Sequence, residues 1–224
     1  MIPLRDHLRQ APPPHVNYCL ITLNFLVFAW ELSLGFRLPK ATQILGFIPA
    51  RFVGYFHHSG TAFSQAVMPL LTSLFLHGNL LHFLPNMCFL FIFGGKVEDV
   101  LGPGRYLLFY LTGGVGAGLI YFLVAPSSAV PLIGASGAIA AVMAAYFSLF
   151  PGERFSTLFI ITWVLLQFFY ATFALMSKST GQAGMAWWAH VGGFLLGLVL
   201  IHLLAPRAVR LLPFRSRPQK PPVD

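Results

Sequence analysis

The feature that most constrains this chain is a recurrence of apolar stretches about as long as a lipid bilayer is thick. A helix needs about 20 consecutive apolar residues to cross the hydrocarbon core. Stretches of about this length recur along most of the sequence. The bilayer core offers no water to unpaired backbone groups, so such stretches are stable there as helices. The sequence therefore predicts an all-α membrane protein with one helical domain.

Six membrane spans are predicted, separated by polar, Gly- or Pro-containing turns. Only 9% of the 224 residues are charged, against roughly 25% in soluble domains. The spans are expected at about 18–36, 79–96, 105–124, 134–151, 156–176 and 185–204. The helical domain would cover residues 18–204, between an N-terminal segment, 1–17, and a basic Pro-rich tail, 205–224. No cleavage signal stands out, so we expect the first span to be retained.

The basic residues predict which side of the membrane the chain ends face. Six spans put both ends on one side, and Lys and Arg are enriched in cytoplasmic loops. Four of the 14 basic residues fall on the opposite side, namely Arg37, Lys40, Arg51 and Lys178. The others lie with the termini, which we expect to be cytoplasmic. No basic run is interleaved with aromatic residues, so the charge of +8 does not predict nucleic-acid binding.

Several polar side chains fall inside the predicted spans, where they are costly unless they are paired or hydrated. His82 and Asn86 lie near the start of the second span, and their i, i+4 spacing puts them on one helix face. Ser136 begins the fourth span and His190 lies early in the sixth. These three spans run in the same direction, so the four side chains are expected at similar depth, toward the outer face, where they can meet.

The small residues around Ser136 and His190 suggest how the two meet. In Gly134-Ala135-Ser136-Gly137, small residues permit a tight entry into a helix with free N–H groups at its positive end. Small residues also recur every four positions in the two spans, as Ser136, Ala140 and Ala144 and as Ala189, Gly193 and Gly197. Such rows allow close helix packing, which is also the commoner role of an isolated Ser in a span. A Ser and a His together favour a nucleophile and its base.

The acidic residues narrow the possible chemistry. There are 6, namely Asp6, Glu31, Glu98, Asp99, Glu153 and Asp224. None is well placed as the third member of a catalytic triad, so a Ser-His dyad is expected. An aspartyl protease needs two opposed aspartates in its spans, and a zinc protease needs H-E-x-x-H or an equivalent ligand set. Neither is present, and no metal or organic cofactor is expected.

Taken together, these motifs resemble those of the rhomboid intramembrane serine proteases. The matching residues are His77, His82 and Asn86 in H-x4-H-x3-N, Gly134 to Gly137 in G-x-S-G, and Ala189 to Gly197 in A-H-x-x-G-x3-G. The resemblance implies that Ser136 is the nucleophile and His190 the general base. It also implies that His82, Asn86, Gly134 and the Ser136 amide form the oxyanion and substrate site.

The resemblance carries further expectations about the scaffold. Glu98 matches a structural acid, His77 a position with a structural hydrogen bond, and residues 37–69 an outer loop embedded in the membrane. Ala140 stands where some family members have an aromatic residue that stacks on the catalytic His. The sequence therefore leaves open what positions the His190 ring.

The expected activity is endopeptidase cleavage of single-span membrane proteins, with the lipid bilayer as the other partner and a bacterial inner membrane as the location. The alternative is a non-catalytic rhomboid-like protein that binds membrane clients. A transporter or channel is disfavoured, because no charge pair lies at the midplane. The sequence does not indicate an oligomeric state.

Overall fold

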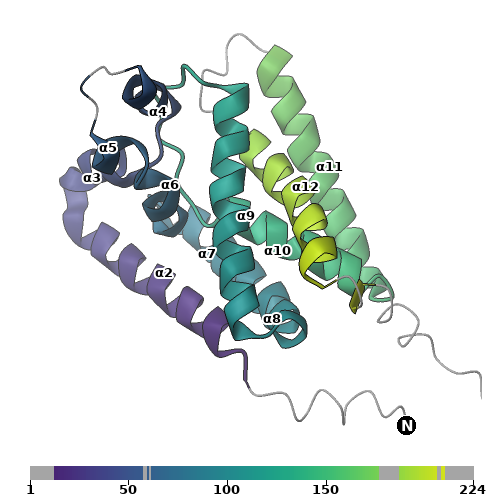
Figure 1. Cartoon of the computed structure of the whole chain (residues 1–224). Coiled ribbons are helices and arrows are strands. Elements are labelled where there is room, and N and C mark those ends of the chain that lie inside the picture. Colours follow the sequence, from purple (N-terminus) through teal and green to yellow (C-terminus); the bar gives the residue numbers. More distant parts are fainter. Residues whose placement is uncertain (1–12, 58–59, 61, 177–186, 206–207, 210–224) are drawn as a thin grey trace, which may run out of the picture.

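The computed structural model describes residues 13–57, 60, 62–176, 187–205 and 208–209. These residues are almost entirely helical, which confirms the all-α class (Figure 1). Within them, the β structure is an isolated bridge between Phe47 and Leu132. The elements are α2 (His15–Leu34), η1 (Gly35–Arg37), α3 (Leu38–Leu45), α4 (Pro49–Phe56), α5 (Phe63–Ala66), α6 (Pro69–Thr72), η2 (Ser73–Phe75), α7 (Leu80–Phe89), η3 (Leu90–Gly94), α8 (Gly95–Leu101), α9 (Pro103–Val124), α10 (Ser136–Leu149), α11 (Arg154–Met176) and α12 (Trp187–Leu204).

Four helical stretches of the described chain are long and apolar enough to cross a membrane. They are His15–Leu45, Leu80–Leu101, Pro103–Val124 and Trp187–Leu204, which correspond to predicted spans one, two, three and six. Three further apolar stretches are shorter, namely Phe63–Phe75, Ser136–Leu149 and Ser156–Phe169, and the last two fall in predicted spans four and five. The membrane-protein class is thus confirmed, while the count of six and the cytoplasmic termini stay predictions. Residues 185–186 of the sixth predicted span, Lys178 and most of both terminal segments lie outside the described residues.

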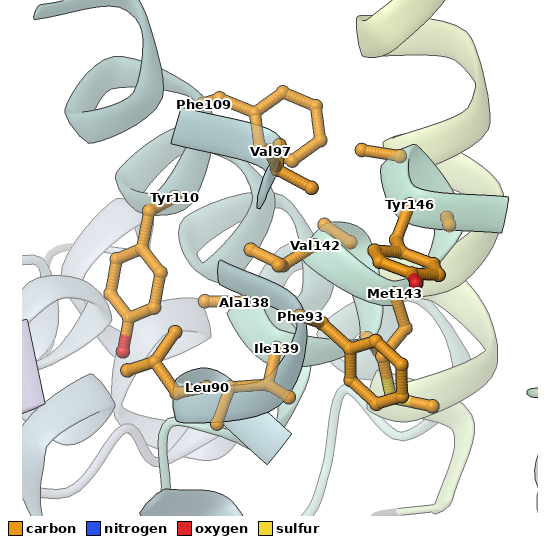
Figure 2. Close-up of a cluster of buried hydrophobic side chains, with 14 of the residues drawn as sticks. Leu90, Phe93, Val97, Phe109, Tyr110, Ala138, Ile139, Val142, Met143 and Tyr146 are labelled. Atoms are coloured by element: carbon orange, nitrogen blue, oxygen red, sulfur yellow. The ribbon is translucent and has the colours of Figure 1, made fainter. Parts of the chain in front are cut away.

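The short helix α10 is the centre of the fold. All of its residues from Gly137 to Tyr146 are buried, and it contacts α9, α12 and η3. Figure 2 shows Val142 and Met143 of α10 among the side chains of Phe93 and Val97. With 14 residues at about 1.5 Å each, α10 is shorter than the hydrocarbon core. Protein rather than lipid surrounds it, so it does not have to match the thickness of the bilayer.

Helices α10 and α12 approach at the level of their backbones. A Cβ atom added to Gly197 would lie 2.5 Å from the Cα atom of Ala141, and one added to Gly193 would clash with the carbonyl oxygen of Gly137. The close packing predicted from the small residues of the two spans is therefore present. The α10 residues that meet these glycines are Gly137 and Ala141, one position along from the predicted row of Ser136, Ala140 and Ala144.

At the N-terminal end of α2, Glu98 of α8 accepts hydrogen bonds from the backbone N–H groups of Val16 and Asn17, at 3.0 and 2.7 Å. The Asn17 side chain donates to the Leu90 carbonyl, at the start of the π-helical turn η3, and accepts from the Tyr106 hydroxyl. A helix start leaves its first N–H groups without intrahelical partners, and Glu98 supplies partners for two of them. This agrees with the scaffold role expected of Glu98.

A second carboxylate anchors the loop that precedes α7. Glu31 of α2 is 1% exposed and accepts hydrogen bonds from the backbone N–H of His77, at 2.9 and 3.1 Å, and of Gly78, at 3.1 Å. The carbonyl of His77 in turn lies 2.8 Å from Nδ1 of His82. The main chain of His77 therefore makes structural hydrogen bonds through both its N–H and its carbonyl. Glu31 fixes the segment that orients the His82 ring.

The close approach of α12 to α10 can be tested with Gly197→Ala. The added methyl group would push the two backbones apart, and overpacking of this kind costs about 1–3 kcal/mol. The matched control is Gly104→Ala in α9, where an added Cβ meets no atom within 4 Å. We expect the melting temperature of the detergent-solubilised protein to fall for Gly197→Ala and to stay level or rise for Gly104→Ala. Equal melting temperatures for the two variants would contradict this packing.

Replacement of Glu31 by Gln tests the loop anchor. The Gln amide keeps one acceptor oxygen, but its NH₂ group would face a backbone N–H of His77 or Gly78 and could not bond to it. We therefore expect a loss of about 1–3 kcal/mol in stability. Glu153→Gln is the control, because its ion pair with Lys96 is exposed and such pairs contribute little. Denaturant unfolding of both variants is the measurement. The anchor is refuted if Glu31→Gln loses no more stability than Glu153→Gln.

Candidate functional site

The packing of α12 on α10 brings together two residues that are 54 positions apart. Ser136 is the first residue of α10, and His190 lies in the first turn of α12. Nε2 of His190 is 2.7 Å from Oγ of Ser136. A hydroxyl donating to an unprotonated ring nitrogen is the arrangement of a nucleophile and its base. The structure thus juxtaposes the two residues singled out from the sequence, and their catalytic role stays a prediction.

The other ring nitrogen of His190 contacts a residue that sequence reasoning missed. Nδ1 lies 2.7 Å from Oε1 of Gln167 in α11, and Gln167 is only 7% exposed. Aromatic rings also lie close to the imidazole, with centroid distances of 5.9 Å for Trp163 and 5.4 Å for Trp187. The available signal was that Gln167 is the only side-chain amide in the predicted fifth span.

Gly134 occupies a position where a residue with a side chain would displace the His82 ring. Its φ of 120° is rarely adopted by residues with a side chain, and its N–H donates to the Ser73 carbonyl at 2.8 Å. A Cβ atom here would lie 2.7 Å from Cε1 and Nε2 of His82 and 3.5 Å from Oγ of Ser136. The His82 ring, Gly134 and Ser136 therefore gather at the N-terminal end of α10.

The hydrogen bond of His82 fixes what its ring can do. The His77 carbonyl can only accept, so the proton lies on Nδ1 of His82 and the neutral ring presents Nε2 as an acceptor. The ring can donate from Nε2 to an oxyanion only when it is positively charged.

Asn86 lies one helical turn after His82, and its Nδ2 donates to the His82 carbonyl at 2.8 Å. This bond uses one of the two N–H groups of the amide. The contacts of the described residues connect Asn86 to His82 and do not include one to Ser136. Of the predicted site residues, Ser136, His190, Gly134 and His82 are thus assembled directly, and Asn86 is connected through His82.

Comparison with known proteins gives a consistent family. Residues 64–207 match the model of the Rhomboid domain. "Rhomboid-like protein 11, chloroplastic" of Arabidopsis thaliana is 33% identical over 171 residues, which cover 67% of this chain and 56% of the relative. "Presenilin-associated rhomboid-like protein, mitochondrial" of Homo sapiens is 29% identical over 187 residues, covering 80% of this chain and 45% of the relative.

The relatives are longer than this chain and are named for organelles. The chain spans about half the length of the curated relatives it matches. Both relatives are named for organelles, so they give no support to the predicted bacterial inner membrane, whereas the membrane-spanning helices support a membrane location. The Rhomboid domain match covers more than half of the sequence. The chain therefore belongs to the rhomboid family.

Proposed function

We propose that this chain is an intramembrane serine endopeptidase that cleaves single-span membrane proteins with Ser136 and His190. The observation that carries this proposal is the 2.7 Å contact between the two side chains. A client-binding member of the family would have no need of a nucleophile aligned with a base. Fold alone does not establish activity, so the proposal rests on this geometry within a membrane-embedded fold.

In the proposed reaction, a substrate helix unwinds locally and exposes its scissile carbonyl to Ser136. Oγ of Ser136 attacks the carbonyl carbon while Nε2 of His190 takes the hydroxyl proton. The same ring then gives that proton to the leaving amine, and the peptide bond breaks to leave an acyl ester on Ser136. Water, activated by His190, hydrolyses the ester and regenerates the hydroxyl.

Charge on the carbonyl oxygen would be stabilised at the N-terminal end of α10. The first N–H groups of a helix have no intrahelical partner and lie at its positive end. The second N–H of Asn86 and a charged His82 ring are the further proposed donors. Preorganised donors of this kind commonly contribute the largest share of catalysis in acyl transfer.

The polarity of the helices supports a single accessible site. Ser136, His190 and His82 lie at or near the N-terminal ends of α10, α12 and α7. With the termini in the cytoplasm, as the basic residues predict, these ends face the outer side of the membrane. Water would then reach the acyl ester from that side rather than through lipid.

The dyad is tested by labelling the purified protein with a fluorophosphonate, which reacts with an activated serine, and by cleavage of a single-span substrate. We expect Ser136→Ala and His190→Ala to lower both by about a thousandfold or more. The control is Ser148→Ala, on the same helix, which removes only a hydrogen bond to the Ala144 carbonyl. If a folded wild type neither labels nor cleaves, the client-binding function replaces this proposal. Labelling that persists in Ser136→Ala would identify another nucleophile.

The oxyanion donors are tested by Asn86→Ala and His82→Ala. Loss of one donor lowers kcat by about 10²–10³-fold in comparable sites, with a smaller effect on KM because the oxyanion exists only in the transition state. His202→Ala is the matched control, since His202 is an exposed residue of α12 that bonds only the Leu198 carbonyl among described residues. Steady-state kinetics on variants with unchanged melting temperatures are the measurement. Unchanged kcat in both variants would place the oxyanion elsewhere.

A further inference from the structure

Gln167 is a polar residue on an otherwise apolar, inward-facing side of α11. Ile160, Trp163 and Gln167 are buried or half-buried and recur at the spacing of one helix face. Leu158, Leu165 and Phe168 on the other side are exposed. An amide is costly to bury unless it is hydrogen-bonded, and the Gln167 amide bonds to the His190 ring.

We propose that Gln167 is a positioning residue that selects the tautomer of His190 able to act as a base. This inference rests on the proposed function. An amide oxygen can only accept, so with Oε1 facing Nδ1 the ring must carry its proton on Nδ1. The lone pair is then on Nε2, which faces the Ser136 hydroxyl. One contact on the far side of the ring thus decides whether Ser136 meets a base.

The opposite orientation of the amide would switch the site off. If the amide nitrogen faced Nδ1, it would donate to it, and the ring proton would move to Nε2. Ser136 would then face an N–H group and could not be deprotonated by the ring. The orientation with Oε1 toward Nδ1 is the one consistent with a hydroxyl that donates to Nε2.

No carboxylate of the described chain is engaged at this position. Glu31 bonds the loop before α7, Glu98 the start of α2, and Glu153 the side chain of Lys96. In triads of other folds the third position is filled by a carboxylate, or by an amide in the Cys-His-Asn sites of papain-like proteases. An amide orients the imidazole as a carboxylate does but supplies no negative charge to the imidazolium.

Helix α11 also supplies a ring beside the imidazole. Trp163 lies four residues before Gln167, on the same helix face, with its ring centroid 5.9 Å from that of His190. Ala140 of α10 is fully buried and has no ring to stack on His190. The Gln167 amide and the Trp163 indole together restrain the imidazole from the α11 side. These two side chains therefore position the His190 ring, a role that Ala140 cannot fill.

The kinetic test uses Gln167→Leu and Gln167→Glu, with Gln65→Leu, at an exposed position of α5, as a control. Leu keeps the bulk but removes the acceptor, so we expect kcat to fall at least about tenfold, with KM nearly unchanged. Glu restores an acceptor and is expected to rescue most of kcat. Equal loss in both variants, or wild-type kcat in Gln167→Leu, overturns the proposal.

The pH profile of kcat/KM separates positioning from packing. Besides Gln167, the titratable or polar groups that act on the His190 ring from neighbouring helices are His82 from α7 and Ser136 from α10, and the substitution changes neither. A carboxylate at position 167 favours the charged ring, so the acidic limb for Gln167→Glu should move up by at least about one pH unit. A limb that does not move overturns the proposal.

A readout that does not need activity distinguishes failure of this inference from failure of the proposed function. The ¹⁵N chemical shifts of the His190 ring report which nitrogen carries the proton. We expect Nδ1 to be protonated in the wild type and the tautomers to mix in Gln167→Leu. If the wild type does not cleave but shows this pattern, the protease proposal fails and the role of Gln167 stands. A proton on Nε2 in the wild type refutes the role of Gln167.

Discussion

The backbone-level approach of α12 to α10 is the constraint on which the rest of the structure depends. Gly193 and Gly197 lie against Gly137 and Ala141 because no side chain intervenes. In a membrane, lipid tails are as apolar as helix surfaces, so helices associate through close contact of small residues. This contact sets the separation of the two helices. The hydrogen bond between Ser136 and His190 forms at one end of it.

Three of the buried polar groups join segments that are far apart in the sequence. Glu98 holds the start of α2, Glu31 holds the loop before α7, and Gln167 reaches His190 on α12. An unpaired polar group is expensive in an apolar interior, so each of these bonds constrains a helix position. The two carboxylates hold the scaffold, and the amide meets the functional pair. The same physical rule therefore shapes both the fold and the site.

The sequence predicted some residues of the site and missed one. Ser136 and His190 could be selected because a hydroxyl and an imidazole in apolar spans need a reason to be there, and His82 and Gly134 followed from their motifs. Gln167 could not be selected in the same way, since an isolated amide in a span can bond to any nearby carbonyl. The row of small residues on α10 was placed one position off, because helical spacing gives a face but not the rotation of that face toward its neighbour.

By itself, the sequence determined the class of the protein and the chemistry available to it. Long apolar stretches require helices in a membrane. The residue types supply a serine and a histidine within the spans, but no opposed pair of aspartates there and no zinc ligand set. Only the tertiary structure decided which groups meet, namely Oγ of Ser136 with Nε2 of His190, and Nδ1 of that ring with Gln167. Composition and residue spacing describe one helix at a time. These contacts depend instead on how α10, α11 and α12 are rotated and how far apart they lie, and side-chain packing sets both.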